Sequence, residues 1–330
     1  MTSILLSAPY MIPHHERFKP IFEHYGLSVI LPEVHERMSE DELLAYAGQF
    51  DGVICGDDRF TARVIKKCAP RLKVISKWGT GIDSIDCAAA AEMGIPVKNT
   101  TNAFTLPVSD SVMAYILTFA RELLRLDRAM KAGRWEKTPM KSLSECTLGV
   151  IGVGNVGKAV LRRARPFGMK LLGNDIIPIA PDFIVENNVE MTSLPDLLQR
   201  ADFVTVNCDL NPTSYHIMNE KSFGLMKPGA VFINTARGPL QDEKALIAAL
   251  REGKIRGAGL DVFENEPLPL DSPLLKMENV LLAPHNSNSS PAAWERVHKN
   301  TIRNLLIELG IACDDLDDLM SITEDKAIKR

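Results

Sequence analysis

Short apolar runs alternate with amphipathic runs along the first hundred residues. The apolar runs are four or five residues long and rich in Ile, Val and Leu, which is typical of buried strands. The amphipathic runs combine charged and apolar positions at helical spacing. This alternation predicts a parallel sheet covered by helices. We expect strands at 4–7, 27–31, 52–55 and 72–76, and helices at 15–25, 40–49 and 62–68.

A long helical pattern then runs through residues 105–131. At about 1.5 Å per residue, a single helix here would be about 40 Å long and could connect two domains. A second alternating series follows, and the chain is helical again over 291–309 before a polar tail. The second series predicts strands at 148–152, 170–174, 203–207, 230–234, 257–261 and 280–283, with helices at 158–167, 193–199, 220–226 and 243–251.

Length and composition fit a globular protein of two domains. The chain has 330 residues, and 38 Lys and Arg against 42 Asp and Glu give a net charge of −4. It lacks the basic excess typical of a nucleic-acid-binding protein. The apolar stretch 111–120 is short of the roughly 20 residues of a membrane span, and residues 1–12 lack the basic leader of a signal peptide.

The six cysteines and seven histidines show no C-x-x-C or H-E-x-x-H spacing. Scattered thiols are typical of a reduced cytosolic protein. We therefore expect a cytoplasmic protein with no metal site, no membrane span and no nucleic-acid partner.

A glycine motif opens the second alternating series. Gly152, Gly154 and Gly157 form a G-x-G-x-x-G between a predicted strand and a predicted helix, and Asp175 ends the next strand, 23 residues after Gly152. Gly152 would allow a tight turn, Gly154 would let the backbone approach a pyrophosphate, and Gly157 would let helix and strand pack closely. Asp175 would bind a ribose diol and repel a 2′-phosphate, which predicts NAD rather than NADP. The alternative is an ordinary glycine turn with a solvated aspartate.

Three further polar residues each follow a predicted strand of the same sheet. Arg237 lies in Asn-Thr-Ala-Arg-Gly, Glu266 in Asp-Val-Phe-Glu-Asn-Glu-Pro, and His285 in Ala-Pro-His-Asn. Ligands of open α/β sheets bind at the carboxyl ends of strands. A cation, a carboxylate and an imidazole at that edge suit hydride transfer to a keto acid. Taken singly, each residue could equally be structural.

With these motifs the sequence resembles the D-isomer-specific 2-hydroxyacid dehydrogenases, most nearly their phosphoglycerate dehydrogenase-like branch. The resemblance covers roughly residues 50–310 and is densest at 149–158, 226–240, 257–267 and 282–286. It implies Arg237, Glu266 and His285 as the catalytic residues and the backbone amides of Thr80 and Gly81 as further holders of the substrate carboxylate. It also implies a homodimer, and cofactor contacts at Asn155, Val156, Asp175, Ser214, Ala236 and Asp261 beside the three glycines.

The mechanism we expect is reversible hydride transfer between NAD(H) and a small 2-hydroxy or 2-keto acid. Arg237 would bind the carboxylate, His285 would exchange the proton, and Glu266 would orient His285. One alternative is a non-enzymatic NAD(H)-binding corepressor or sensor of the same fold. Another is a formate dehydrogenase, against which Glu266 argues. An L-specific dehydrogenase would carry its glycine motif near the start of the chain.

Several positions depart from the family pattern or bear on substrate choice. Ser109-Asp110 stands where Ala-Glu is common, and Asp209 where a proline is usual. Asp57 and Asp58 follow the third strand and would repel a phosphate, which favours an unphosphorylated substrate. Alternatively they cap a helix near Thr61, and Lys77 could bind a phosphate instead. The three tryptophans, Trp78, Trp294 and Trp135, are candidates for packing, the substrate pocket or a subunit contact. Trp294 could wall the pocket or pack between domains, and Trp135 could contact a second subunit.

We therefore predict two Rossmann-like or flavodoxin-like α/β domains with a cleft between them. Residues 1–104 with 288–330 would form the substrate domain, and 105–287 the NAD-binding domain. The helices predicted at 105–131 and 291–309 would be the two crossings between them.

Overall fold

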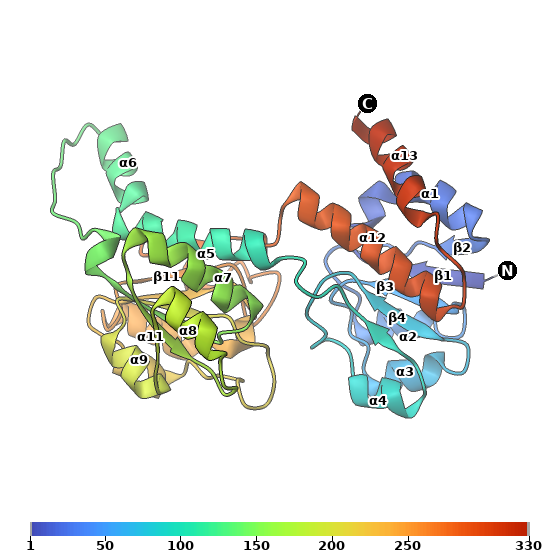
Figure 1. The fold of residues 1–330 in the computed structure, drawn as a ribbon, viewed down its shortest axis with the longest axis horizontal. Helices are drawn as coiled ribbons and strands as arrows, with labels where there is room; N and C mark the ends of the chain where they lie inside the picture. Colours follow the sequence, from blue (N-terminus) through green and yellow to red (C-terminus); the bar gives the residue numbers. More distant parts are fainter. Residues whose placement is uncertain (1, 329–330) are drawn as a thin grey trace. The chain divides into compact units, whose positions relative to one another are not determined.

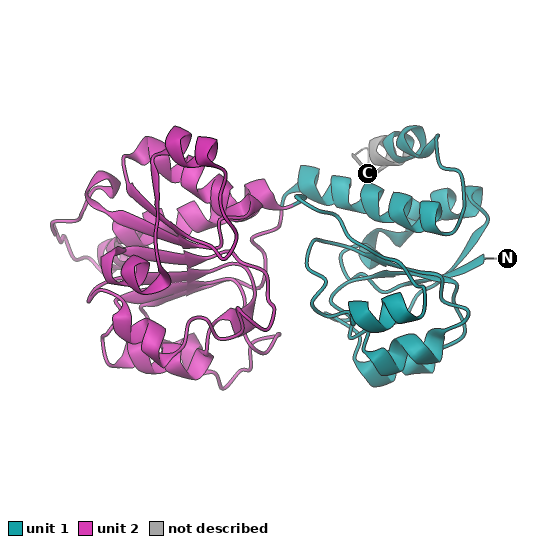
Figure 2. Cartoon of the chain, turned by 60° about the horizontal axis from the view of Figure 1, so that its bottom comes forward, with its two compact units in different colours: residues 1–103, 290–330 teal, residues 104–289 magenta. Residues whose placement is uncertain are grey.

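The computed structural model describes residues 2–328 and contains two parallel sheets, each in its own compact unit (Figures 1 and 2). Unit 1 comprises Met1–Ala103 and Ser290–Arg330, and unit 2 comprises Phe104–Ser289. Strand–helix alternation therefore leads to the predicted class, a mixed α/β protein with two Rossmann-like sheets, and this prediction is confirmed.

Unit 1 has a five-stranded sheet in the order β2-β1-β3-β4-β5. Helices α2, α3 and α4 bury Leu43, Val64 and Ala90 against one face, while α12 lies against β3 and β4 on the other. The strands are β1 Thr2–Leu6, β2 Leu27–Ile30, β3 Gly52–Cys55, β4 Val74–Lys77 and β5 Val97–Lys98. The helices are α1 His15–His24, α2 Glu40–Ala45, α3 Ala62–Cys68, α4 Cys87–Glu92, α12 Pro291–Glu308 and α13 Leu316–Ile328, with a 3-10 turn at Ile12–His14.

Unit 2 has a seven-stranded sheet in the order β12-β11-β10-β9-β6-β7-β8. Helices α9, α10 and α11 pack on one face, and α5, α7 and α8 on the other. The strands are β6 Thr147–Ile151, β7 Lys170–Asn174, β8 Val189–Met191, β9 Phe203–Val206, β10 Val231–Asn234, β11 Gly257–Leu260 and β12 Val280–Leu282. The helices are α5 Thr105–Ala120, α6 Leu123–Lys131, α7 Asn155–Ala164, α8 Pro181–Asn187, α9 Leu194–Arg200, α10 Glu220–Leu225 and α11 Glu243–Arg251. Single 3-10 turns lie at Leu143–Glu145, Arg165–Phe167, Gly238–Leu240 and Pro273–Lys276.

The order of the second sheet creates a switch point at β6. Its neighbours β7 and β9 lie on opposite sides, and chain connections run away from it in both directions. Doubly wound sheets bind ligands at the carboxyl ends of strands at such a point. The glycine motif directly follows β6.

The prediction of one continuous helix over 105–131 is wrong. The chain leaves the helix at Arg121, and Glu122 adopts a left-handed conformation with φ 47° before α6 begins. Glu122 accepts a hydrogen bond from Arg125 at 2.6 Å and lies 3.6 Å from Arg256, and these ion pairs stabilise the break. The apolar periodicity continues across the break, so it carries no sign of the turn.

The prediction of a polar C-terminal tail is also wrong. Asp317 and Asp318 lie in the first turn of α13, which contacts α1 and α12 and buries Leu316 and Met320. Asp315 accepts hydrogen bonds from Tyr25 at 2.7 Å and pairs with His24 at 2.8 Å. The charges therefore pair with neighbouring helices rather than only with water. The short elements β5, β8, α4 and α8 were not predicted from the sequence.

Candidate active site

The glycine loop joins β6 to α7 and has the geometry of a phosphate cradle. Gly152 has φ +85°, and a Cβ there would lie 2.5 Å from the backbone nitrogen of Cys208. A Cβ on Gly157 would lie 2.0 Å from the carbonyl oxygen of Gly152, so only glycine lets α7 pack this closely on the turn. Gly154 caps α7 and has nothing within 4 Å of its Cβ position. This open approach to the N-terminus of a ten-residue helix suits a pyrophosphate.

Asp175 lies immediately after β7 and reaches back to the glycine loop. Its carboxylate accepts hydrogen bonds from the backbone N–H groups of Val153, at 2.6 Å, and Ile177, at 2.9 Å. The predicted ribose-binding carboxylate is thus attached to the loop that suits the pyrophosphate. These residues fit a dinucleotide in both charge and shape.

His285 and Glu266 form a hydrogen-bonded pair at the ends of β12 and β11. His285 Nδ1 lies 3.0 Å from Glu266 Oε2, and the other carboxylate oxygen accepts the N–H of Phe263 at 2.9 Å. His285 has φ +49°, an uncommon conformation for a side-chain-bearing residue. The two side chains are about one-fifth exposed.

Asp261 holds the backbone of His285 and its loop, and is itself only 1% exposed. Its backbone oxygen accepts the N–H of His285 at 2.8 Å, and its carboxylate accepts the N–H groups of Asn286 and Ser287 at 2.8 and 2.9 Å. The family resemblance implies a cofactor contact at Asp261. In the structure, both of its carboxylate oxygens hold the loop that carries His285.

Arg237 follows the end of β10, and β10 is the neighbour of β11 in the sheet. The buried Asn234 shapes its loop by donating to the carbonyl oxygen of Arg237 at 2.8 Å and accepting from the N–H of Ala236 at 3.0 Å. A Cβ on Gly238 would lie 1.9 Å from the carbonyl carbon of Phe263. The backbones that carry Arg237 and Glu266 are therefore in direct contact, and the three predicted catalytic residues follow three neighbouring strands.

The remaining cofactor candidates of unit 2 border the same edge of the sheet. Asn155 and Val156 begin α7. Ser214 is buried, donates to the carbonyl oxygen of Asp209 at 2.6 Å and accepts the N–H of Asn211 at 2.9 Å. Asp209 therefore contributes its backbone to this turn. The other departure, Ser109-Asp110, lies inside α5, where Asp110 pairs with Arg163 of α7 at 2.6 Å.

In unit 1, Thr80 and Gly81 follow β4, and the Thr80 hydroxyl donates to the carbonyl oxygen of Thr100 at 2.9 Å. Lys77 at the end of β4 is only 3% exposed and pairs with Asp57 at 3.0 Å.

The suggestion that Asp57 and Asp58 cap a helix is wrong, because Thr61 caps α3. Asp58 is fully buried and accepts hydrogen bonds from Ser7, Met38 and Gly56.

The tryptophans of unit 1 pack with each other. Trp294 on α12 lies 5.7 Å from Trp78 and 5.2 Å from Tyr10, measured between ring centroids. Trp78 donates its indole N–H to Nδ1 of His298 at 3.0 Å. Trp135, in contrast, is 78% exposed in the segment after α6.

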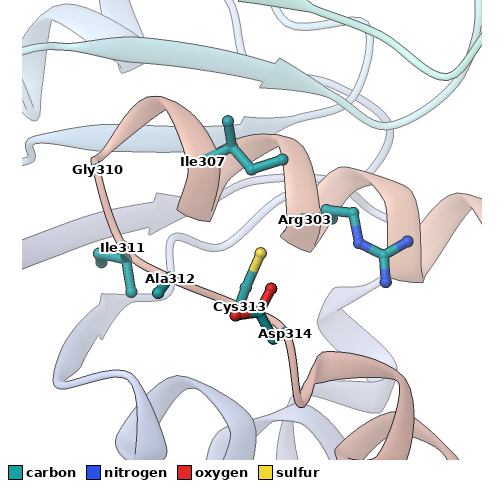
Figure 3. Close-up of a pocket in the computed structure, with 7 residues that line it drawn as sticks. All are labelled: Arg303, Ile307, Gly310, Ile311, Ala312, Cys313 and Asp314. Atoms are coloured by element: carbon teal, nitrogen blue, oxygen red, sulfur yellow. The ribbon is translucent and has the colours of Figure 1, made fainter.

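Away from these residues, a surface pocket of about 510 Å³ lies at the end of α12 (Figure 3). Arg303, Ile307 and the segment 310–314 line it, so it contains none of the predicted site residues. Among residues 2–322, whose side chains the structure describes, no three His, Cys, Asp or Glu residues are grouped as metal ligands. No helix of the described chain is both long and apolar enough to cross a membrane.

Comparison with known proteins identifies the family. Residues 113–287 match the model of the NAD binding domain of the D-isomer specific 2-hydroxyacid dehydrogenases. The chain belongs to this family. The predicted NAD-dependent oxidoreductase of 2-hydroxy acids is thereby confirmed, with NAD as its cofactor.

Relatives within this family carry several names. A glyoxylate reductase of Korarchaeum cryptofilum is 41% identical over 73% of this chain and 74% of its own length. A D-3-phosphoglycerate dehydrogenase of Methanocaldococcus jannaschii is 38% identical over 89% of this chain. The chain spans 55% of that relative's length. The D-lactate dehydrogenase of Aquifex aeolicus, solved with NAD and lactic acid, has a TM-score of 0.81 at 27% identity and covers 92% of this chain and 93% of its own.

Sequence reasoning did not identify the residues that position the catalytic candidates. Asn234 holds the Arg237 loop and Asp261 holds the His285 loop, both through backbone contacts. A buried polar residue at the last position of a strand, or just after it, was the available signal. Its partners became visible only in the folded chain.

Proposed function

We propose that this protein interconverts a small, unphosphorylated 2-keto acid and its D-2-hydroxy acid, with glyoxylate and hydroxypyruvate as the first candidates. The observation that carries the proposal is the Glu266–His285 pair, 3.0 Å apart, with the loop of Glu266 in backbone contact with the Arg237 loop. Relatives named glyoxylate reductase and hydroxypyruvate reductase are 41% and 38% identical to this chain, which supports the choice of acid.

The chain's residues would divide the work as follows. NAD, when bound, accepts or supplies the hydride. The Arg237 guanidinium binds the carboxylate of the acid, with the backbone N–H groups of Thr80 and Gly81 as further donors. Glu266 accepts the Nδ1 proton of His285, which leaves Nε2 to exchange the proton of the substrate oxygen. The carboxylate favours the imidazolium and so supports proton donation during reduction.

The cofactor contacts remain part of the proposal. We assign the pyrophosphate to the loop of Gly152, Gly154 and Gly157 with Asn155 and Val156, and the adenosine ribose to Asp175. Ser214, Ala236 and Asp261 complete the proposed cofactor contacts. The main role of Asp261 is to hold the His285 loop beside the cofactor site. The negative charge of Asp175 favours NAD over NADP.

The contacts of Lys77 support a substrate without a phosphate. This residue is nearly fully buried and pairs with Asp57, and it donates to the carbonyl oxygen of Trp78 at 3.0 Å. Its charge is thus already neutralised within unit 1. Arg59 follows two carboxylates in sequence, so the turn after β3 presents no net positive charge to a phosphate.

A substrate panel tests the proposal. NADH oxidation is measured with glyoxylate, hydroxypyruvate and phosphohydroxypyruvate, and we expect kcat/KM to be higher for the two unphosphorylated acids. The variant His285→Asn should lower kcat by roughly 10²–10⁴, the usual effect of losing a general acid–base residue. A clear preference for phosphohydroxypyruvate would overturn the substrate assignment. NADH binding without turnover of any 2-keto acid would instead favour the corepressor alternative.

We also propose that the protein works in the cytoplasm as a homodimer. All six cysteines are unpaired thiols, which supports a reducing compartment. The exposed apolar side chains of α6 support the dimer.

A further inference from the structure

A second histidine–carboxylate pair lies on the loop that carries Glu266. His216, on the connection after β9, has its Nε2 2.8 Å from Glu264 Oε1, and both side chains are 28% exposed. The backbone of His216 is left-handed, with φ 49°. Among residues 2–328, His216 and His285 are the only histidines in this conformation. Such conformations persist where the surrounding contacts fix them, and they cluster at functional sites.

Glu264 is also fixed from α11. Its carboxylate accepts the N–H of Glu243 at 3.2 Å, and its own N–H donates to the Glu243 carboxylate at 3.4 Å. The ring of Tyr215 stacks on His216 at 4.0 Å. In the part of the chain that the structure describes, the charged groups that pair with His216 or with its partner are Glu264 and Glu243.

The backbone ties these loops to Arg237 as well. The N–H of His216 donates to the carbonyl oxygen of Pro239 at 2.9 Å. Gly238, one residue earlier, is in backbone contact with Phe263 and Glu264. Phe263 in turn donates its N–H to Glu266, whose other carboxylate oxygen holds His285. A short series of contacts thus leads from His216 through Glu264 and Phe263 to the Glu266–His285 pair.

We propose that His216 is a positioning residue for the reaction: by holding Glu264, it fixes the loop that aims Glu266 at His285. The inference rests on the proposed function only in taking His285 as the proton-exchanging group. No contact of His216 with substrate is required. Outer partners of this kind commonly change activity 10- to 100-fold when removed from metal sites, and we expect an effect at the low end here.

The test measures the pKa of His285 in the unliganded protein, by NMR of histidine labelled with ¹⁵N. In His216→Ala, Glu266 is less well held and stabilises the imidazolium less. We therefore expect the pKa of His285 to fall by about one unit. In keto-acid reduction, the alkaline limb of the kcat profile should move to lower pH by the same amount. We expect kcat to fall about 10-fold while KM for NADH stays within about twofold.

Matched variants separate positioning from general stability. His216→Gln keeps a side-chain N–H near the position of Nε2 and should restore most of the kcat and the pH profile. His24→Ala removes a pair of the same type, 2.8 Å from Asp315, in unit 1, and should leave both measurements unchanged. In a Glu266→Gln background, His216→Ala should shift the pKa of His285 no further, because the path runs through Glu266.

An unchanged pKa of His285 and an unmoved pH limb in His216→Ala would overturn the proposal, even if the melting temperature falls. Glu264→Gln preserves the side-chain shape and weakens the His216–Glu264 pair. If His216→Ala does not fold, the pKa of His285 in Glu264→Gln therefore tests the proposal in its place. The NMR measurement needs no turnover. A protein inactive on every 2-keto acid would therefore defeat the proposed function while leaving this test intact.

Discussion

Two histidines of this protein, His285 and His298, show how the partner of one ring nitrogen determines the chemistry of the ring. His285 has Glu266 at Nδ1, which favours the charged ring. His298 is 3% exposed and accepts the indole N–H of Trp78 at Nδ1, which requires the neutral ring. Burial is the main reason that the pKa of His298 falls to about 3, and the nearby His14 and Arg17 lower it further. The same residue type is thus paired with a carboxylate in unit 2 and is a hydrogen-bond acceptor in unit 1.

This difference predicts an acid-sensitive stability that depends on His298. The unfolded chain has a histidine pKa of about 6.5, whereas the folded value is about 3. Between these values the unfolded state binds more protons, so the free energy of unfolding falls as the pH drops below about 6.5. His298→Asn keeps an acceptor near Nδ1 without the titration. Between pH 7 and pH 5, we expect the wild type to lose up to about 2 kcal/mol more than this variant in urea unfolding. His35→Asn, at an exposed site, is the control, and equal pH dependence of all three proteins would refute the assignment.

Asp175 predicts the cofactor preference at the same scale. Its carboxylate is placed beside the glycine loop by two backbone N–H groups. Asp175→Ala should raise KM for NADH about 10-fold, the effect of losing one hydrogen bond to a charged group, and should narrow the preference over NADPH. Asp175→Asn retains the shape and removes only the charge, so it should relieve the repulsion of a 2′-phosphate with less harm to the loop. Steady-state kinetics with both cofactors measures these effects. If the ratio of kcat/KM with NADH to kcat/KM with NADPH is unchanged in both variants, Asp175 does not determine the cofactor preference.

At the scale of elements, buried carboxylates tie loops together where strands end. Asp58 connects three segments of unit 1, accepting from the Ser7 hydroxyl after β1, the Met38 N–H before α2 and the Gly56 N–H after β3. Burial raises the pKa of Asp58, and these hydrogen bonds oppose that rise. The sequence suggested a helix cap for this residue because a carboxylate shortly before a helix commonly has that role. Two of its three partners, Ser7 and Met38, lie 51 and 20 residues away, beyond the reach of a local pattern.

Removing Asp58 should therefore destabilise unit 1 strongly. Asp58→Ala leaves two N–H donors and one hydroxyl without their acceptor in the interior, and we expect a loss of about 3 kcal/mol in the free energy of unfolding. Asp41→Ala serves as the control, because the Asp41 side chain is 89% exposed. Chemical denaturation measures both. A loss below about 1 kcal/mol in Asp58→Ala would show that the network contributes little.

The two helices after residue 104 show where periodicity stops being informative. In α5, Val112 and Ile116 face the sheet and are fully buried. In α6, Ala129 is the one buried residue, and Leu123 and Met130 are about half exposed. Apolar residues recur at helical spacing in both segments, but four of the nine residues of α6 are charged, against one of sixteen in α5. The left-handed Glu122 marks the boundary between the core helix and the exposed one.

At the scale of the molecule, the sequence predicted most of what local patterns can specify. The long strands were predicted within about two residues, and the placement of Arg237, Glu266 and His285 past three strand ends followed from them. The two-residue strand β5 gave no detectable alternation. Helix α13 was missed because Leu316 and Met320 are buried where it packs on α12 and on α1, a helix near the start of the chain. The His216–Glu264 pair joins residues 48 apart, and no spacing rule connects them.

The exposed helix α6 leads to the prediction for the assembly. Leu123, Leu124 and Met130 are between 46% and 53% exposed, and Trp135 is 78% exposed. Apolar side chains gathered on one exposed segment mark an interaction surface, and two-fold pairing is the commonest way to cover such a segment in a homo-oligomer. We expect light scattering to give twice the chain mass of 36.5 kDa. Replacing Leu124 and Met130 together by glutamate should shift the mass toward one chain, whereas the same change at the exposed Ile322 of α13 should not. A mass of one chain at every concentration tested would reject the dimer, and an unchanged dimer in the double variant would place its interface on another element.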